Sequence, residues 1–407
     1  MSQARPRQAV ILAGGKGLRL RPLTQSTPKP MILVNGRPFL EYLIENLKEN
    51  GFEKILLLLG YLPDKIRNHF KDGESFGVSI EYSVTQIEND TGARIKRARD
   101  MLDPCFLLMY CDNYWPLRAD EMWERFKRSR ASAQITVYSN KDDYTKDNVR
   151  LGENGVVEFY DKSRASHGLK GVDIGYALIK RDAVFPAIDS GNVSFEGTAY
   201  PKLAEKGELT AFVTDHRYYS IGSRDRMQTT KRFLARRPAV ILDRDGVLNE
   251  KPPKAQYVEK WSQFKWLPGS VEAIRLLRAN GYTIIVITNQ AGVARGIMTK
   301  QEVEDIHKKM SGDLENANLS LDAIYYCPHG WDDDCECRKP LPGMLYMAQR
   351  EFHLDLTKTY FIGDDIRDKQ AGDAAGCPCL LVSKDKSLLD LVGAILGNSV
   401  TVSQATG

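Results

Sequence analysis

Two carboxylates lie two residues apart, directly after an apolar run that predicts a buried strand. Asp243 and Asp245 follow residues 239–242, and a glycine comes next. At the end of a strand, one carboxylate can act as a nucleophile beside Mg²⁺, while the other donates a proton to the leaving group and then accepts one from water. The same spacing also occurs in surface turns, because Asp and Gly favour turns.

Further polar residues in this half of the chain strengthen the catalytic interpretation. A threonine hydroxyl at the end of a strand can donate a hydrogen bond to a phosphoryl oxygen, and fixed cations can bind the same group. Carboxylates after another strand suit a metal ion. The residues concerned are Thr288 and Asn289, Arg338 and Lys339, and Asp364 and Asp365.

Four soft metal ligands fall within eleven residues of the same half. Three thiolates and one imidazole make a closed tetrahedral zinc site, which leaves no position for water and is therefore structural. Such a site would stiffen the loop that carries the two cations. Free cysteines in a loop are the alternative. The ligands would be Cys327, His329, Cys335 and Cys337.

The remaining cysteines fit the pattern of buried thiols, and they are Cys105, Cys111, Cys377 and Cys379. The total of seven is odd. Together with the metal-type spacing, it indicates a reducing compartment rather than a disulfide scaffold, so we expect a cytoplasmic protein.

A glycine-rich loop opens the first half of the chain, after the apolar run 9–13. Glycines let backbone amides approach phosphate oxygens, and nearby cations can stabilise a leaving pyrophosphate. A glycine pair alone is also typical of a tight strand-to-helix turn. The residues of interest are Gly14, Gly15, Gly17, Arg19 and Lys29, in a string that also contains Pro22-Leu23-Thr24 and Pro28-Lys29-Pro30.

The elements that must position these residues alternate between helix and strand in both halves. This alternation is typical of α/β domains with parallel sheets, whose ligands bind at the carboxyl ends of the strands. We expect helices at 40–49 and 271–280, and strands at 54–59, 106–110, 282–287 and 359–362.

Length and charge bound the possibilities further. The chain has 407 residues, which is enough for two to three domains. A basic stretch places the boundary near residue 236, giving domains at 1–236 and 237–407. The net charge of +4 is too small to indicate nucleic-acid binding. No apolar run reaches the roughly 18 residues that a membrane span needs, and the start of the chain is a poor signal peptide.

The first half, over residues 7–235, resembles the sugar-1-phosphate nucleotidyltransferases, in particular the heptose-1-phosphate guanylyltransferase type. The resemblance implies a GT-A-like Rossmann fold. It also implies that Asp112 holds Mg²⁺, that Lys162 contacts the sugar phosphate and that Gly92 lies near the nucleotide base.

Three positions depart from that family. Asn89 and Asp90 stand in its glycine-rich stretch, Asp161 stands where a glutamate precedes the lysine, and Ser220 stands where a second metal aspartate is common. Asp215 could replace that aspartate only if the backbone folds it back. A first half that only senses sugar nucleotides therefore remains an alternative.

The second half, over residues 237–385, resembles the haloacid dehalogenase phosphatases, which pass through an aspartyl-phosphate. The resemblance makes Asp243 the nucleophile and Asp245 the acid and base, with Thr288 and Lys339 on the phosphoryl group. The implied Mg²⁺ set is Asp243, Asp245 (through its backbone carbonyl) and Asp364, with Asp365 and Asp368 as further candidates.

The zinc loop resembles those of heptose 1,7-bisphosphate 7-phosphatases and of histidinol phosphatases. The ligand spacing slightly favours the second, and the surrounding sequence favours the first. In a heptose enzyme, Arg295 would bind the second phosphate.

These resemblances predict two Rossmann-like α/β domains, a GT-A-like nucleotidyltransferase followed by a phosphatase with a zinc loop. Their reactions are successive, because removal of the 7-phosphate yields a heptose 1-phosphate that the transferase can activate, with GTP as the implied nucleotide. We expect Mg²⁺ in both domains, zinc in the second, and nucleoside triphosphate and sugar phosphates as partners, with no nucleic acid or membrane. A transferase for mannose or another hexose 1-phosphate is the alternative.

Overall fold

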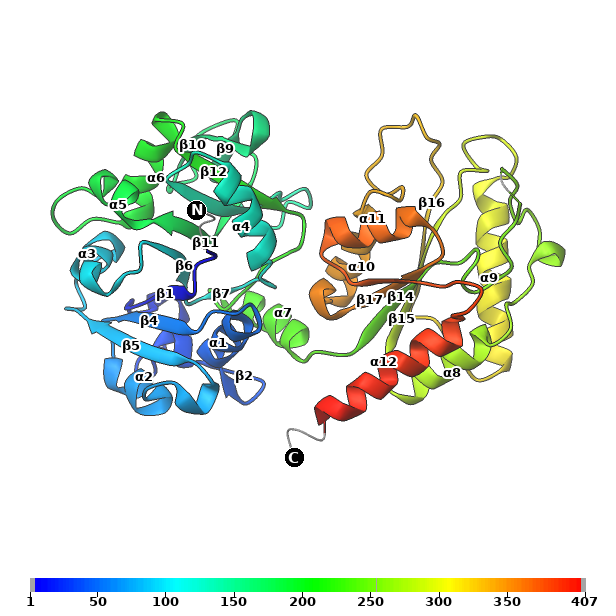
Figure 1. Cartoon of the computed structure of the whole chain (residues 1–407), viewed down its shortest axis with the longest axis horizontal. Coiled ribbons are helices and arrows are strands. Elements are labelled where there is room, and N and C mark those ends of the chain that lie inside the picture. The colour runs from blue at the N-terminus through cyan, green and yellow to red at the C-terminus, as the bar shows by residue number, and fades with distance from the viewer. Residues whose placement is uncertain (1–3, 254, 404–407) are drawn as a thin grey trace. The chain divides into compact units, whose positions relative to one another are not determined.

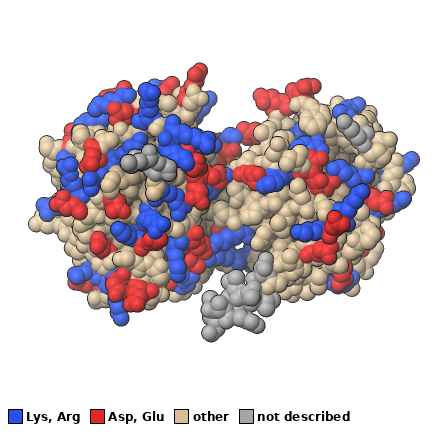
Figure 2. All heavy atoms as spheres, viewed as in Figure 1, with Lys and Arg blue, Asp and Glu red and all other residues tan. Residues whose placement is uncertain are grey.

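The computed structural model describes residues 4–253 and 255–403. The chain divides between Leu234 and Ala235 into two compact units, within two residues of the predicted boundary. No helix in the described ranges is long and apolar enough to cross a membrane. Basic and acidic side chains are interspersed over the visible face of each unit (Figure 2).

The first unit is built on a seven-stranded sheet with the order β12-β8-β11-β6-β1-β4-β5 (Figure 1). Its strands are mostly apolar, and β1 is buried along its whole length. The strands are β1 (Gln8–Ala13), β4 (Lys54–Leu59), β5 (Ser79–Val84), β6 (Cys105–Tyr110), β8 (Ala133–Tyr138), β11 (Val172–Lys180) and β12 (Leu209–Thr214).

Helices cover both faces of this sheet. Apolar residues of α1, α2, α4 and α7 pack in one core, and those of α3, α5 and α6 pack in the other. Each helix buries one apolar side, as residues spaced three and four apart allow. The helices are α1 (Phe39–Glu49), α2 (Pro63–Phe70), α3 (Thr91–Arg97), α4 (Ala119–Arg128), α5 (Arg181–Val184), α6 (Phe195–Glu205) and α7 (Arg224–Leu234).

Three two-stranded ribbons complete the first unit: β2 (Leu33–Val34) with β3 (Arg37–Pro38), β7 (Asn113–Tyr114) with β13 (Tyr219–Ser220), and β9 (Val149–Leu151) with β10 (Val157–Tyr160).

The expectation of a parallel sheet is wrong for one strand of the first unit. Strand β11 runs antiparallel to both of its neighbours, β6 and β8. The chain between β8 and β11 contains the β9–β10 ribbon and no α-helix. Without a crossover helix, the chain returns beside β8 in the opposite direction.

The second unit has a parallel five-stranded sheet with the order β16-β15-β14-β17-β18. Helices α8, α9 and α12 pack on one face, and α10 and α11 on the other (Figure 1). The elements are β14 (Ala239–Leu242), α8 (Ser270–Ala279), β15 (Thr283–Asn289), α9 (Lys300–Asn316), β16 (Ala323–Cys327), α10 (Gly343–Phe352), β17 (Tyr360–Gly363), α11 (Ile366–Ala375), β18 (Cys379–Leu381) and α12 (Leu388–Ser403).

All six helices and strands expected from apolar periodicity are present, with ends that differ by a residue or two. The cysteine expectation holds for Cys111 and Cys377, which are buried, whereas Cys105 and Cys379 are only half-buried.

Candidate active sites

The Asp243 cavity lies at the carboxyl ends of β14, β15 and β17. These three parallel strands end side by side, so Asp243, Thr288 and Asp364 reach the same cavity of about 620 Å³. The sequence places these residues far apart, and the sheet order brings them together.

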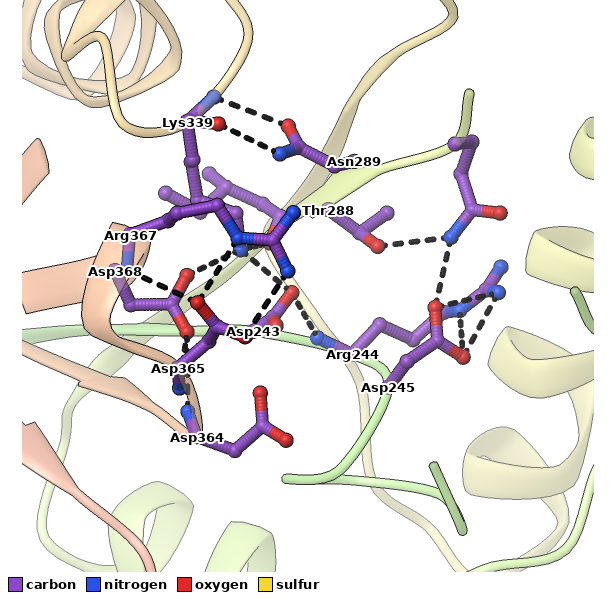
Figure 3. A network of polar contacts seen from close by, with 12 residues as sticks. Asp243, Arg244, Asp245, Thr288, Asn289, Lys339, Asp364, Asp365, Arg367 and Asp368 are labelled. Carbon is purple, nitrogen blue, oxygen red and sulfur yellow. Dashed lines mark hydrogen bonds and ion pairs between the residues drawn. The ribbon is translucent and has the colours of Figure 1, made fainter. Parts of the chain in front are cut away.

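A buried lysine connects two carboxylates in this cavity. The Lys339 ammonium lies 2.8 Å from Asp243 Oδ1 and 2.7 Å from Asp368 Oδ1 (Figure 3). Burial raises the pKa of Asp243 to about 7, against the lowering effect of the Lys339 charge. The Asp243 carboxylate therefore depends on positive charge beside it to remain ionised.

Three carboxylates converge beside this lysine. One oxygen from each of Asp243, Asp364 and Asp368 lies within 4.8 Å of the others. Asp368 is fixed by the backbone N–H groups of Asp364 and Asp365, which both donate to its Oδ2 at 3.0 Å. Oxygen donors at this density suit Mg²⁺.

The Asp245 carboxylate is directed away from these three carboxylates (Figure 3). It accepts hydrogen bonds from Arg244, from Asn249 at 2.9 Å and from Gln290 at 2.8 Å. Burial would raise its pKa, but the Arg244 charge and the three donors outweigh burial, and the pKa lies below its ordinary value. In this conformation Asp245 is an ionised acceptor rather than an acid.

Asn289, expected to bind substrate, lines the cavity and also contacts Lys339. Its Nδ2 donates to the Lys339 carbonyl oxygen at 3.0 Å, and its Oδ1 accepts from the Lys339 N–H at 3.1 Å. Both ends of the amide are thus used to hold the backbone of Lys339. Thr288 is buried and accepts from Gln290, whereas Arg295 and Arg338 line the cavity.

The predicted Cys/His ligands gather at one point. The Cys327 sulfur lies 3.9 Å from that of Cys335 and 3.5 Å from His329 Nδ1, which in turn lies 3.3 Å from the Cys337 sulfur. Thiolates about 2.3 Å from a tetrahedral ion stand about 3.8 Å apart, so the spacing fits a four-ligand metal site. Its last ligand precedes Arg338 and Lys339 directly.

In the first unit, two cavities meet at the loop after β1. The loop cavity has a volume of about 420 Å³ and is lined by Gly14, Gly15 and Gly17. The Ser220 cavity has a volume of about 470 Å³ and is lined by Ser220 among other residues. Arg19 and Asp112 line both cavities. A substrate in each cavity would therefore meet the other at these two residues.

Asp112 follows β6 and pairs with Lys29 from the loop. The Lys29 ammonium lies 2.5 Å from Asp112 Oδ2. A single carboxylate of this kind suits Mg²⁺ that is bound mainly by phosphate oxygens. The expected residues Asn89 and Asp90 also line the loop cavity.

Two expected binding residues lie outside both linings. Gly92 is buried, and a Cβ there would lie 2.7 Å from the Val193 carbonyl oxygen, so this glycine serves packing. Lys162 pairs with Glu196 at 3.0 Å. Neither residue borders the two cavities.

Asp215 does not supply the carboxylate that is missing at the position of Ser220. Asp215 pairs with Lys141 at 3.1 Å and does not line the Ser220 cavity. Ser220 does line it, and its Oγ accepts from the Gly222 N–H. Asp173 also lines this cavity, and desolvation raises its pKa to about 6.

Comparison with known proteins assigns both units. A family model described as nucleotidyl transferase matches residues 8–167, and one described as polynucleotide kinase 3 phosphatase matches residues 239–394. The D-glycero-beta-D-manno-heptose-1,7-bisphosphate 7-phosphatase of Yersinia pestis is 40% identical over 145 residues, which are 34% of this chain and 76% of that protein. The chain belongs to the heptose bisphosphate phosphatase family. The Bordetella bronchiseptica enzyme of the same name is 43% identical over 143 residues, 35% of this chain and 79% of that protein.

Solved structures resemble each half of this heptose bisphosphate phosphatase family member. The B. bronchiseptica D,D-heptose 1,7-bisphosphate phosphatase, complexed with magnesium and phosphate, has 35% identity and a TM-score of 0.37, and covers 40% of this chain and 99% of its own. HddC from Yersinia pseudotuberculosis has 24% identity and a TM-score of 0.47, covering 55% and 98%. The protein is an enzyme that joins a nucleotidyltransferase domain to a phosphatase domain.

Several residues of this phosphatase family member were not anticipated from the sequence. Arg244 is fully buried and binds Asp245, and Arg94 is a buried cation that donates to the Gly14, Leu59 and Ile87 carbonyl oxygens. Arg244 lies between Asp243 and Asp245 in the sequence, so its position beside them could have been predicted. Arg94 carries no motif, and only the fold brings it to the glycine loop.

Proposed function

We propose that this enzyme removes the 7-phosphate of D-glycero-D-manno-heptose 1,7-bisphosphate and then transfers GMP from GTP to the heptose 1-phosphate produced. The observation that carries the proposal is the pairing, in one chain, of a phosphatase unit of the heptose family with a nucleotidyltransferase unit. The first activity makes the kind of substrate that the second consumes. A histidinol phosphatase would give the first unit no substrate.

In the phosphatase unit, we assign the attack on the 7-phosphate phosphorus to Asp243. The bond between phosphorus and the heptose oxygen breaks, and water then hydrolyses the aspartyl-phosphate. Lys339 and Thr288 hold the phosphoryl oxygens. Asp245 protonates the heptose oxygen, which requires its carboxyl to leave the Arg244 guanidinium first.

Metals complete both units in this proposal. Asp243, Asp364, Asp368 and the Asp245 backbone carbonyl would hold Mg²⁺ in the phosphatase unit, and Asp112 would hold it in the transferase. When bound, Mg²⁺ neutralises phosphate charge. Cys327, His329, Cys335 and Cys337 would hold zinc in a structural role, and the bound metal would stabilise the loop that carries Arg338 and Lys339.

In the transferase unit, the anomeric phosphate attacks the α-phosphorus of the nucleotide and pyrophosphate leaves. We place the nucleotide in the loop cavity and the sugar phosphate in the Ser220 cavity, because the two share Arg19 and Asp112. Arg19 and Lys29 stabilise the charge of the departing pyrophosphate. We also propose a cytoplasmic location, which the free thiols and a nucleoside triphosphate substrate support.

The test is to incubate the purified enzyme with the heptose bisphosphate, Mg²⁺ and, separately, GTP, ATP, CTP or UTP. Mass spectrometry follows phosphate, pyrophosphate and sugar nucleotide. We expect GDP-heptose with GTP, and phosphate in every reaction. A sugar nucleotide with a different base would correct the choice of GTP.

Two other outcomes would replace the proposal for the first unit. Phosphate release without pyrophosphate, followed by transfer to mannose 1-phosphate or another hexose 1-phosphate, would assign a hexose substrate. Binding of a sugar nucleotide without any pyrophosphate release would make the first unit a sensor.

A further inference from the structure

One large aromatic side chain of the metal-ligand loop faces the Asp243 cavity. Trp331 lies between the ligands His329 and Cys335, is 58% exposed and lines the cavity. Tryptophan is highly buried on average in folded proteins. The position of Trp331 on the loop suggests a contact with substrate or with a group that binds substrate.

Two guanidinium groups lie against the Trp331 ring. The Arg338 guanidinium carbon is 4.5 Å from the ring centroid, and that of Arg367 is 5.4 Å from it. Both distances are within the range of cation–π attraction, which favours arginine over a tryptophan face. The ring therefore holds two cations that also line the cavity.

The two arginines differ in their other partners. Arg367 donates from Nε and Nη2 to the two oxygens of Asp365, at 2.9 and 3.0 Å, so its charge is neutralised. Arg338 is only 8% exposed, and its Nη1 donates to the His329 carbonyl oxygen at 3.1 Å. Its buried Nε has no hydrogen-bond partner in the described part of the chain.

The other lysines of the cavity are already paired. Lys339 lies between Asp243 and Asp368, and Lys251 lies 2.7 Å from Asp364. Within residues 4–253 and 255–403, Arg338 and the exposed Arg295 line the cavity without a carboxylate partner. An unneutralised cation with a buried, unused donor is suited to an anionic ligand.

A bisphosphate substrate brings two such anions. The cleaved phosphate lies at Asp243, so the other must find its cations elsewhere along the cavity. We propose that Trp331 is a positioning residue, which stacks on the Arg338 guanidinium and holds it for the substrate phosphate that is not cleaved. The inference rests on the proposed phosphatase function.

The test compares Trp331→Phe with Trp331→Leu in the full chain. Both variants keep an apolar side chain in the loop, but only phenylalanine can stack on the Arg338 guanidinium. The leucine variant should raise KM for the heptose bisphosphate about tenfold, with kcat changed less than about twofold. The phenylalanine variant should stay near wild type. For p-nitrophenyl phosphate, which carries only the cleaved phosphate, kcat/KM should be unchanged in both.

A double-mutant cycle separates positioning from direct contact. In an Arg338→Gln background, Trp331→Leu should add no further increase in KM. An equal increase in that background, or the same KM for phenylalanine and leucine, would overturn the proposal. So would a lower metal content in the leucine variant than in the phenylalanine variant, since the ring would then support the metal site. Absence of phosphate release by the wild-type enzyme would instead contradict the proposed function.

Discussion

The Lys339 ammonium lies 2.8 Å from the Asp243 carboxylate, and the backbone of this lysine is held at both its N–H and its carbonyl by Asn289. The cation is therefore positioned by its main chain as well as by its charge. Its side chain is almost fully buried, so its removal leaves carboxylates without a counter-ion.

Lys339→Met should reduce phosphate release by at least about a hundredfold, because a fixed cation on the phosphoryl group is lost. It should also lower the unfolding temperature of the phosphatase unit, because Asp243 and Asp368 then repel each other. Added Mg²⁺ should raise that temperature more than in wild type. Thermal unfolding with and without Mg²⁺ measures this, with Lys251→Met as the control at a half-exposed lysine of the same cavity. Equal unfolding temperatures in wild type and Lys339→Met would contradict the prediction.

Asp243→Asn and Asp112→Asn should separate the two activities. The first should abolish phosphate release and leave transfer to supplied heptose 1-phosphate intact, because an amide cannot form the aspartyl-phosphate. The second should do the reverse. Phosphate and pyrophosphate are measured in parallel on both variants. Loss of both activities in either variant would show that the units do not act independently.

Lys29→Met should lower the rate of pyrophosphate release by about a hundredfold or more, because the cation beside Asp112 is removed. Phosphate release should not change. Lys16→Met, at an exposed lysine of the same loop, is the matched control and should keep its activity. If both lysine variants lose the same activity, the net charge of the loop matters rather than the position of Lys29.

Cys335→Ala should lose the bound metal and destabilise the phosphatase unit, because three ligands hold zinc less tightly than four and binding contributes to folding. A strong chelator should have the same effect on the wild type. Metal per chain is measured by elemental mass spectrometry. Cys379→Ala, at a half-buried thiol outside the cluster, should retain its metal. A fully loaded Cys335→Ala protein would exclude this residue as a ligand.

Asp173→Asn should change how stability depends on pH. Burial raises the pKa of Asp173 from 3.8 to about 6. The contribution of this carboxyl to the stability of the folded state is therefore fully present below about pH 4 and is lost as the pH rises through 6. The asparagine variant should gain stability relative to wild type between pH 5 and pH 7.5, by at most about 3 kcal/mol. Loss of the carboxylate as an acceptor for Tyr160 and for the Gly175 N–H reduces this gain.

Thermal unfolding at both pH values measures that difference. Asp161→Asn is the control, because hydrogen bonds from Ser163 and Ser166 lower the pKa of Asp161, so this carboxyl is ionised in both the folded and the unfolded state at pH 5 and above. Its stability relative to wild type should therefore be the same at the two pH values. The same trend in both variants would contradict the assignment of Asp173.

The sequence predicted the strands that carry the phosphatase residues and the four-ligand cluster, since these depend on local apolar runs and on close spacing. It did not predict where the Asp245 carboxylate points, because this depends on hydrogen bonds from Asn249 and Gln290, which lie in other segments of the chain. The antiparallel strand β11 was missed for a related reason. Its direction depends on the connection before it and not on its own residues.

The buried Arg94 changes how the glycine loop can vary. A Cβ at Gly14 or Gly60 would overlap the Arg94 guanidinium, so these two glycines leave space for it. The guanidinium in turn donates a hydrogen bond to the Gly14 carbonyl oxygen. Substitution at either glycine displaces Arg94, and loss of Arg94 leaves a void at both. The three positions are therefore coupled in mutational effect. A library that diversifies this loop one residue at a time will return almost no active variants at Gly14, whereas one that varies the three positions together can reach a different packing of the same loop.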